Sequence, residues 1–209
     1  MANLYLHHVL DTWFEEEVKA RLIGTGSLVR YADDALLMFA NEADARRVLA
    51  VLPKRFARFG LELHPRKTRL VRFVPPSKRR DGEWGSFDLL GFTHYWGKSR
   101  RGRWVIKRKT AKDRLSRSLK RIKCWCQRHR HDRLKQQHEA LSRKLTGHYA
   151  YYGIVGNRSS LFRFRIEVVR IWVKWLGRRS QRRLGWAKAL KLLQADPLPI
   201  PKPWQELAA

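Results

Sequence analysis

Four consecutive residues, Tyr31-Ala32-Asp33-Asp34, constrain this 209-residue chain more than any other feature. Short apolar runs at residues 28–31 and 35–39 flank them, which predicts two strands joined by a tight turn. Adjacent carboxylates at the end of a hairpin repel each other, and a pair of Mg²⁺ ions would compensate them, because Mg²⁺ prefers carboxylate and phosphate oxygen. The alternative is a solvated Asp-Asp turn, since Asp side chains bond to turn backbone. The surrounding sequence has to decide between the two interpretations.

The charge of the chain is high and unevenly distributed. The formal net charge is +28, while hydrophobic residues make up 44% of the chain, enough for a folded core. Residues 1–62 carry 8 Lys or Arg and 9 Asp or Glu, whereas residues 63–209 carry 38 and 9. This asymmetry predicts a scaffold followed by a polyanion-binding surface, with nucleic acid favoured over an anionic membrane.

The sequence contains no recognisable export signal and no apolar run of membrane-spanning length. Its two cysteines, Cys124 and Cys126, are too few to form a zinc site by themselves. Free thiols are typical of a reducing compartment. We therefore expect a cytoplasmic protein that makes no membrane contact.

Helical and extended segments alternate through the first part of the chain. Apolar spacing predicts helices over residues 3–22 and 42–59, and Pro53 should kink or split the second one. Residues 61–64 and 68–74 are expected to be strands, and residues 87–96 a further strand or hairpin. Gly91 indicates a place where another backbone approaches closely.

The character of the chain changes near residue 98, because residues 98–131 contain 15 Lys or Arg and one acid. Apolar residues at helical spacing predict three helices in a bundle with one basic side. The expected buried faces are Ala111, Leu115, Leu119, Ile122 and Cys126 in the first helix, Leu134, Leu141, Leu145, Tyr149 and Tyr152 in the second, and Phe162, Ile166, Val169, Val173 and Leu176 in the third. The Pro-rich end predicts an extended arm.

Five motifs occur along the chain in a fixed order. They are ANLYLHHVLD at residues 2–11, LVRYADD at 28–34, GLELHPRKT at 60–68, LLGF at 89–92 and LTGHYAYYG at 145–153. Together they resemble the second half of the palm and the thumb of a reverse transcriptase. More narrowly, the chain resembles the reverse transcriptase/maturase proteins that bacterial group II introns, a class of mobile element, encode.

The resemblance implies an α+β fold in three parts. Residues 1–97 would form a partial polymerase palm, with antiparallel strands and helices on one face, and residues 98–196 an all-α thumb/maturase bundle of three helices. Residues 197–209 would be a Pro-rich tail. The implied activity is that of an RNA-directed DNA polymerase, a nucleotidyltransferase, whose partners are group II intron RNA and a template–primer duplex.

The resemblance also implies roles for individual residues of the palm. Asp33 and Asp34 would be the catalytic metal ligands at a two-Mg²⁺ site, Asp33 being the stronger candidate. Tyr31 and Ala32 would pack under the incoming nucleotide and the primer end. Lys67 would approach the nucleotide phosphates, although an exposed lysine at a strand end is an equally simple interpretation.

Further residues would bind the nucleic acid. Leu90, Gly91 and Phe92 would hold the primer, with ordinary core packing as the alternative for Phe92. RNA binding is expected from Lys112, Arg114, Arg117, Lys120, Arg121, Arg163, Arg165, Arg170, Lys174, Arg178 and Arg179. Lys and Arg side chains supply affinity for phosphate that falls steeply with salt.

The sequence departs from this family in lacking a third palm carboxylate, which the family places upstream of residue 2 together with the fingers. We therefore expect a fragment with an incomplete metal site, weak or inactive alone, that an upstream palm and fingers segment or a second copy would complete. Two alternatives remain open. One is a non-catalytic, maturase-like RNA-binding module that aids intron folding, and the other is a decayed remnant without function.

Overall fold

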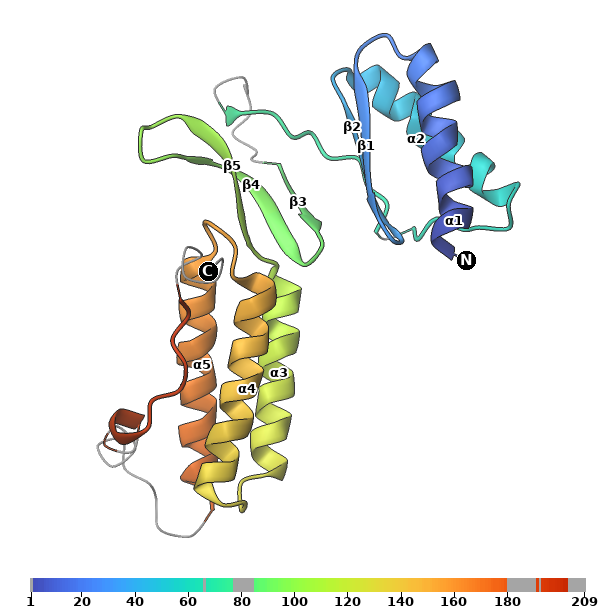
Figure 1. Ribbon diagram of the computed structural model, residues 1–209. Helices are drawn as coiled ribbons and strands as arrows, with labels where there is room; N and C mark the ends of the chain where they lie inside the picture. Colours follow the sequence, from blue (N-terminus) through green and yellow to red (C-terminus); the bar gives the residue numbers. More distant parts are fainter. Residues whose placement is uncertain (1, 66, 77–84, 180–190, 192, 203–209) are drawn as a thin grey trace. The chain divides into compact units, whose positions relative to one another are not determined.

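The computed structural model describes residues 2–65, 67–76, 85–179, 191 and 193–202. It has the predicted α+β composition, with helices and two small antiparallel sheets (Figure 1). The chain divides into two units, Met1–Leu90 and Gly91–Ala209. Each unit has a hydrophobic core of its own.

A continuous run of helical turns opens the first unit, as the apolar spacing of residues 3–22 predicts. It consists of α1 (Ala2–Leu6), η1 (His7–Thr12), η2 (Phe14–Val18) and η3 (Lys19–Arg21), the middle two being π-type turns. One side of this run is buried and forms half of the core, through Val9, Leu10, Trp13, Phe14 and Val18.

The predicted hairpin is present as β1 (Gly26–Tyr31) and β2 (Asp34–Phe39). The strands are antiparallel, with Leu28 opposite Leu37 and Tyr31 opposite Asp34. Because side chains alternate along a strand, Leu28, Leu37 and Phe39 pack against the helices. The other face of the hairpin stays exposed and carries Tyr31.

Helix α2 (Glu42–Ala57) covers the same core with Val48, Leu52 and Phe56. Its start is fixed by Asn41, whose side chain accepts a hydrogen bond from the Ala43 amide. The helix continues through Pro53 as one element, so Pro53 does not split it. Leu52 and Phe56, on either side of Pro53, are both buried, and this burial offsets the lost backbone hydrogen bond.

The strands expected at residues 61–64 and 68–74 are absent, and this prediction was wrong. The described residues between 61 and 75 have irregular backbone, while Leu61 and Leu63 pack their side chains on the core. Their apolar alternation therefore reflects packing, because a strand also needs a hydrogen-bonded neighbour. Arg66, part of the motif at residues 60–68, lies outside the described residues.

A tight turn at Leu90 and Gly91 joins β3 (Ser86–Leu89) to β4 (Phe92–Lys98), which confirms extended structure at residues 87–96. In the second unit β4 pairs with β5 (Trp104–Thr110). Strand β5 differs from the sequence-based prediction, which assigns its Lys and Arg residues to the basic helical region. Buried Asn157 ties its end to the helices, since the Asn157 side chain accepts from the Thr110 amide and donates to the Tyr152 carbonyl.

Three helices lie side by side in the second unit, as predicted (Figure 1). They are α3 (Lys112–Arg128), α4 (Leu134–Tyr152) and α5 (Arg158–Leu176). The buried residues of their shared core are Ile122, Cys126, Leu141, Leu145, Tyr149, Leu161, Phe164, Val168, Trp172, Trp175, Leu176 and Leu198.

The face of α5 that packs on the other helices was predicted only in part, since Val173 and Leu176 are buried and Val169 packs against the core, as expected. Ile166 is 46% exposed and Phe162 is only half-buried, whereas Phe164, Val168 and Trp172 are buried. Helix α5 is apolar around much of its circumference, so two stripes have helical spacing. The observed stripe includes Trp172, whose indole nitrogen donates to buried Gln137 on α4 at 2.9 Å.

The C-terminal segment returns along α5, shown in red in Figure 1. Leu198 is 1% exposed and belongs to the core. Arg165 donates to the carbonyls of Leu198 and Pro199, and the Tyr149 hydroxyl donates to Pro199. The described part of the predicted arm is therefore packed against the helices, and residues 203–209 lie outside the described residues.

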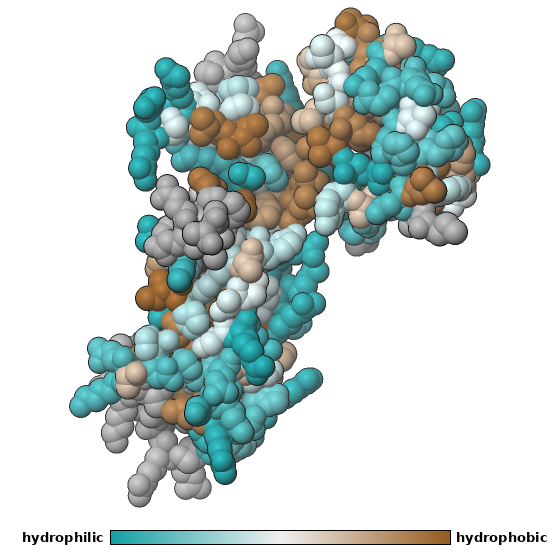
Figure 2. Space-filling model, in the orientation of Figure 1, coloured by the Kyte–Doolittle hydropathy of each residue, from teal (hydrophilic) through white to brown (hydrophobic). Residues whose placement is uncertain are grey.

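The surface of the three-helix part is largely hydrophilic in the view of Figure 2. Among the described residues, no helix combines the length and the apolar character that crossing a bilayer requires.

Candidate functional site

The turn between β1 and β2 has an unusual backbone. Tyr31 and Asp34 form the last strand pair, which leaves Ala32 and Asp33 as the two turn residues. Ala32 has φ 53°, in the left-handed region that non-glycine residues rarely adopt. A positive φ at the first turn residue alone is the pattern of a type II′ hairpin turn, where glycine is usual. Contacts elsewhere must therefore hold this alanine in place.

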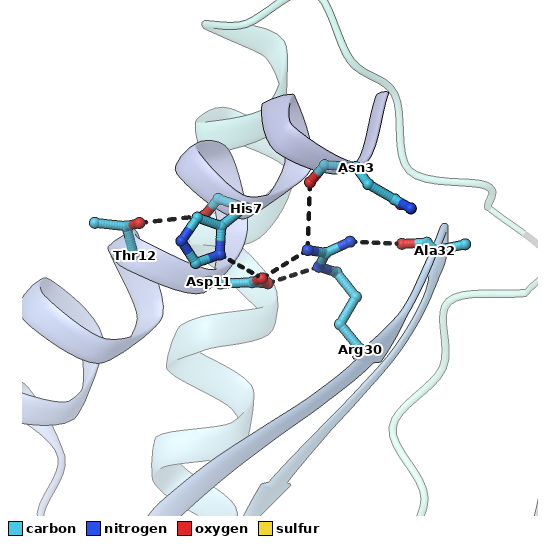
Figure 3. Close-up of polar contacts among 6 residues, drawn as sticks. All are labelled: Asn3, His7, Asp11, Thr12, Arg30 and Ala32. Atoms are coloured by element: carbon cyan, nitrogen blue, oxygen red, sulfur yellow. Dashed lines mark hydrogen bonds and ion pairs between the residues drawn. The ribbon is translucent and has the colours of Figure 1, made fainter. Parts of the chain in front are cut away.

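Arg30 supplies those contacts, as Figure 3 shows. Its Nη1 donates to the Ala32 carbonyl at 2.9 Å. Its Nε and Nη2 each donate to the Asp11 carboxylate at 2.7 Å, and Nη2 also lies 3.4 Å from the Asn3 carbonyl. Bidentate guanidinium–carboxylate pairs are strong and geometrically specific. The turn is thereby fixed to the helical run at the start of the unit.

The electrostatics of this anchor favour a charged pair. The side chains of Arg30 and Asp11 are 13% and 22% exposed, and His7 Nδ1 lies 3.0 Å from Asp11 Oδ2. The hydrogen bond from Arg30 holds the pKa of Asp11 below its ordinary value. Asp11 is therefore a charged carboxylate that positions the turn through Arg30. Sequence reasoning missed this role, although Arg30 falls on the inward-facing positions of β1 together with Leu28.

Asp33 in the turn and Asp34 at the start of β2 are both exposed. Asp34 shares the open hairpin face with Tyr31, which is 67% exposed. Carboxylate oxygens fit Mg²⁺, which often takes one or two carboxylates together with substrate phosphates. Within the described part of the chain, no group of three or more acidic, His or Cys side chains could hold a metal ion. The donor set is thus suited to a cation shared with a bound phosphate, and it is not a closed metal site.

Two other sequence-predicted elements belong to other segments of the chain. Lys67 is exposed in a tight turn in which its amide donates to the His64 carbonyl, and it makes no ion pair with a described residue. In the second unit, Phe92 is stacked against Tyr151 and meets Tyr152 edge-on, at ring-centroid distances of 6.2 and 5.3 Å. Gly91 has φ 80°, and a Cβ there would lie 3.2 Å from the Tyr152 hydroxyl.

Some of the predicted RNA-binding residues already contact other protein groups, and others do not form an ion pair. Arg114 and Arg117 pair with Asp113, Arg170 pairs with Glu167, and Arg165 is occupied by the C-terminal segment. Arg178 lies over the Trp175 ring, and Arg179 donates to the His131 carbonyl. Within this predicted set, the remaining exposed residues that form no ion pair with a described residue are Lys112, Lys120, Arg121, Arg163 and Lys174.

Three further arginines stand at the turn of the β4–β5 hairpin. Arg100, Arg101 and Arg103 are exposed, and the turn is closed by a 2.8 Å hydrogen bond from the Ser99 amide to the Arg103 carbonyl. Gly102 has φ 72°, which the turn requires. The signal in the sequence is the Arg-Arg-Gly-Arg run between two extended segments, whereas the sequence-based prediction includes these residues in the basic helical region.

Comparison with known proteins adds one finding. Residues 1–95 match the family model of the reverse transcriptase (RNA-dependent DNA polymerase) domain. The matched region contains the anchored turn with Asp33 and Asp34, together with Lys67 and Leu90–Phe92. No curated protein matches the chain.

Proposed function

We propose that this chain is part of an RNA-directed DNA polymerase of the kind that bacterial group II introns encode. The observation that carries the proposal is the coincidence of two features. The region that matches the reverse transcriptase family contains a hairpin whose turn, bearing Asp33 and Asp34, is anchored by the Arg30–Asp11 pair. Fixed carboxylates at an exposed turn suit a reaction whose substrate brings its own phosphates.

In this proposal, Asp33 and Asp34 hold Mg²⁺ together with the nucleotide phosphates. The ion, when bound, neutralises charge on the phosphates and on the leaving pyrophosphate. Arg30 and Asp11 position the turn, while Tyr31 presents an exposed ring beside Asp34 for the nucleotide or the primer end. Lys67 would contribute a charge to the phosphates, and Leu90–Phe92 a contact to the primer.

The two Asp residues do not make a complete two-metal site among the described residues. We therefore propose that a further carboxylate is supplied by another palm and fingers segment or by a second copy of this chain. The basic helices would bind the template–primer duplex and the intron RNA, as maturase function requires. Cytoplasmic action is consistent with Cys124 and Cys126 being free thiols.

A second candidate function is RNA binding without polymerisation. The specific observation in its favour is the set of unpaired exposed cations on α3 and α5, defined above, in the unit that lies mostly outside the family match. Such a module would aid the folding of intron RNA through phosphate contacts and shape. Its activity would not depend on Asp33 or Asp34.

Primer extension tests the first proposal against the second. The complete chain is assayed on an RNA template with an annealed DNA primer, deoxynucleotides and Mg²⁺, and compared with Asp33→Asn. A matched control is Glu62→Gln, which removes an equal charge from an exposed side chain of the same unit. We expect Asp33→Asn to reduce synthesis at least about 100-fold and Glu62→Gln to leave it unchanged.

Three outcomes would contradict polymerisation at this turn. Synthesis that persists in Asp33→Asn would place the reaction elsewhere. Absence of synthesis by the folded wild-type chain, together with RNA binding that Asp33→Asn leaves intact, would favour the binding module. Loss of both activities in a folded preparation would indicate a remnant without function.

A further inference from the structure

A small pocket opens between the three helices of the second unit. Its volume is about 280 Å³, just below the roughly 300–1,000 Å³ that is usual for small-molecule sites. Its lining residues are Ser118, Arg121 and Ile122 of α3, Lys144 and His148 of α4, and Phe164 of α5. The pocket therefore has room for one small group. His148 belongs to the motif at residues 145–153, for which the proposed polymerase site gives no role.

His148 is held rigidly at this pocket. Its ring is stacked on Phe164 at a centroid distance of 3.8 Å, and Tyr152 lies 4.5 Å away on a tilted plane. The Nε2 atom is buried and has no hydrogen-bond partner in the described part of the protein. Burial lowers the pKa of His148 to about 4, so the imidazole is neutral at physiological pH. A buried polar nitrogen is costly when unsatisfied, and an acceptor oxygen would satisfy the Nε2–H tautomer.

The other polar groups of the pocket are also hydrogen-bond donors. Arg121 and Lys144 come from different helices, and neither forms an ion pair with a described residue. Lys144 lies over the Trp125 ring, with its Nζ 5.3 Å from the ring centroid. Ser118 adds a hydroxyl, and no carboxylate lines the pocket. Two cations, a hydroxyl and an imidazole N–H form a donor set suited to an oxyanion.

We infer that this pocket binds one phosphate group of a single-stranded RNA backbone, through Arg121, Lys144 and His148. The inference rests on the proposed RNA-binding function and names a specific site for it. Ile122 and Phe164 give the pocket an apolar floor against which the adjoining ribose can pack. A single strand suits the site better than a duplex, because the His148 nitrogen is recessed and an unpaired backbone can bend to bring a phosphate to it.

Binding measurements on the complete chain test this inference. A fluorescent 12-nucleotide single-stranded RNA is titrated with the wild type, Lys144→Met, His148→Phe and the control Lys135→Met. Lys135 is an exposed lysine of the same helix that does not line the pocket. The two lysine variants lose the same charge, and His148→Phe keeps an aromatic ring between Phe164 and Tyr152.

We expect Lys144→Met to bind about tenfold more weakly and to lower the magnitude of the salt slope by about 0.7, the value for one phosphate of a single strand. His148→Phe should weaken binding to a similar extent without changing the slope, because the imidazole is neutral. Lys135→Met should have a markedly smaller effect. Equal behaviour of Lys144→Met and Lys135→Met would overturn the inference, as would an equal loss for duplex RNA.

A second readout separates this site from the proposed function as a whole. Inorganic phosphate is titrated into the wild-type chain while the imidazole resonances of His148 are followed by NMR. A saturable shift that Lys144→Met abolishes supports the pocket, even if the polymerase proposal fails. Imidazole resonances that phosphate leaves unchanged would overturn it, even if the chain binds RNA through other residues.

Discussion

The guanidinium of Arg30 joins the Asp11 carboxylate, 2.7 Å from two of its nitrogens, to the Ala32 carbonyl, 2.9 Å from the third. One side chain thus connects the helical run to the turn that carries Asp33. Because Asp11 and Arg30 are mostly buried, removing either partner leaves an uncompensated charge and should cost more than breaking a surface ion pair. The position of the two exposed carboxylates is therefore determined by residues that sequence reasoning had not considered functional.

Removal of this anchor should destabilise the hairpin. We expect Asp11→Asn to lower the free energy of opening β1 and β2 by about 2 kcal/mol, since it weakens hydrogen bonds to a charged group. Glu15→Gln is the control, because Glu15 pairs with Lys19 on the surface and should contribute less than about 1 kcal/mol. Native-state amide hydrogen exchange in the two strands measures both values. Equal protection in the two variants would contradict the anchoring role.

The positive φ of Ala32 makes a prediction about side-chain size at the turn. Ala32→Gly should leave stability nearly unchanged, because relief of left-handed strain is offset by the greater freedom of the unfolded chain. Ala32→Val should be less stable than Ala32→Gly by about 1–2 kcal/mol, because a β-branched residue strongly disfavours φ 53°. Urea unfolding compares them, and equal midpoints would show that the turn readily adopts another conformation.

Two glycines of the second unit should respond in opposite directions to the same substitution. Gly91 has φ 80°, and its Cβ would lie 3.2 Å from the Tyr152 hydroxyl, so Gly91→Ala should cost about 1–2 kcal/mol. Gly147 lies inside α4 with no atom within 4 Å of an added Cβ. Gly147→Ala should therefore stabilise the chain by up to about 1 kcal/mol through helix propensity. Thermal unfolding distinguishes them, and a shared sign would contradict the geometry.

The buried His148 makes stability depend on pH. Its pKa is lowered to about 4 in the folded chain from an ordinary 6.5, so the unfolded state binds the proton more readily. The full contribution of neutral His148 is present above pH 6.5 and is lost as the pH falls toward 4. Unfolding measured across this window should show a slope that His148→Phe reduces. An unchanged slope in His148→Phe would mean that the imidazole is not buried in solution.

Local signals made much of the fold predictable. Apolar runs typical of strands flank Ala32 and Asp33, which makes the hairpin predictable. The helical run at the start of the chain and helices α2, α3 and α4 each have one clear apolar stripe. These features depend on neighbours within a few residues, so periodicity reports them directly. The exposed position of Asp33 and Asp34 followed from the same local pattern.

The remaining features depend on partners that are distant in the sequence. Leu61 and Leu63 alternate with polar residues as they would in a strand. A strand, however, also requires a hydrogen-bonded neighbour, which the local sequence does not reveal. Ile166 and Phe164 both lie on apolar stripes of α5 with helical spacing. Only contact with α3 and α4 determines that the stripe containing Phe164 is the buried one. The Arg30–Asp11 pair spans 19 residues. Alternation in β1 places Arg30 on the buried face, but it does not identify the carboxylate that meets it.

The central claim is that the anchored turn presents Asp33 and Asp34 to a metal ion that accompanies a nucleotide. The most direct measurement is paramagnetic broadening by substoichiometric Mn²⁺ in NMR spectra of the complete chain, with a deoxynucleotide and a template–primer present. We predict broadening centred on the amides of Tyr31–Asp34 that disappears in Asp33→Asn. Broadening centred on another acidic segment such as residues 15–17, or unaffected by Asp33→Asn, would contradict the claim.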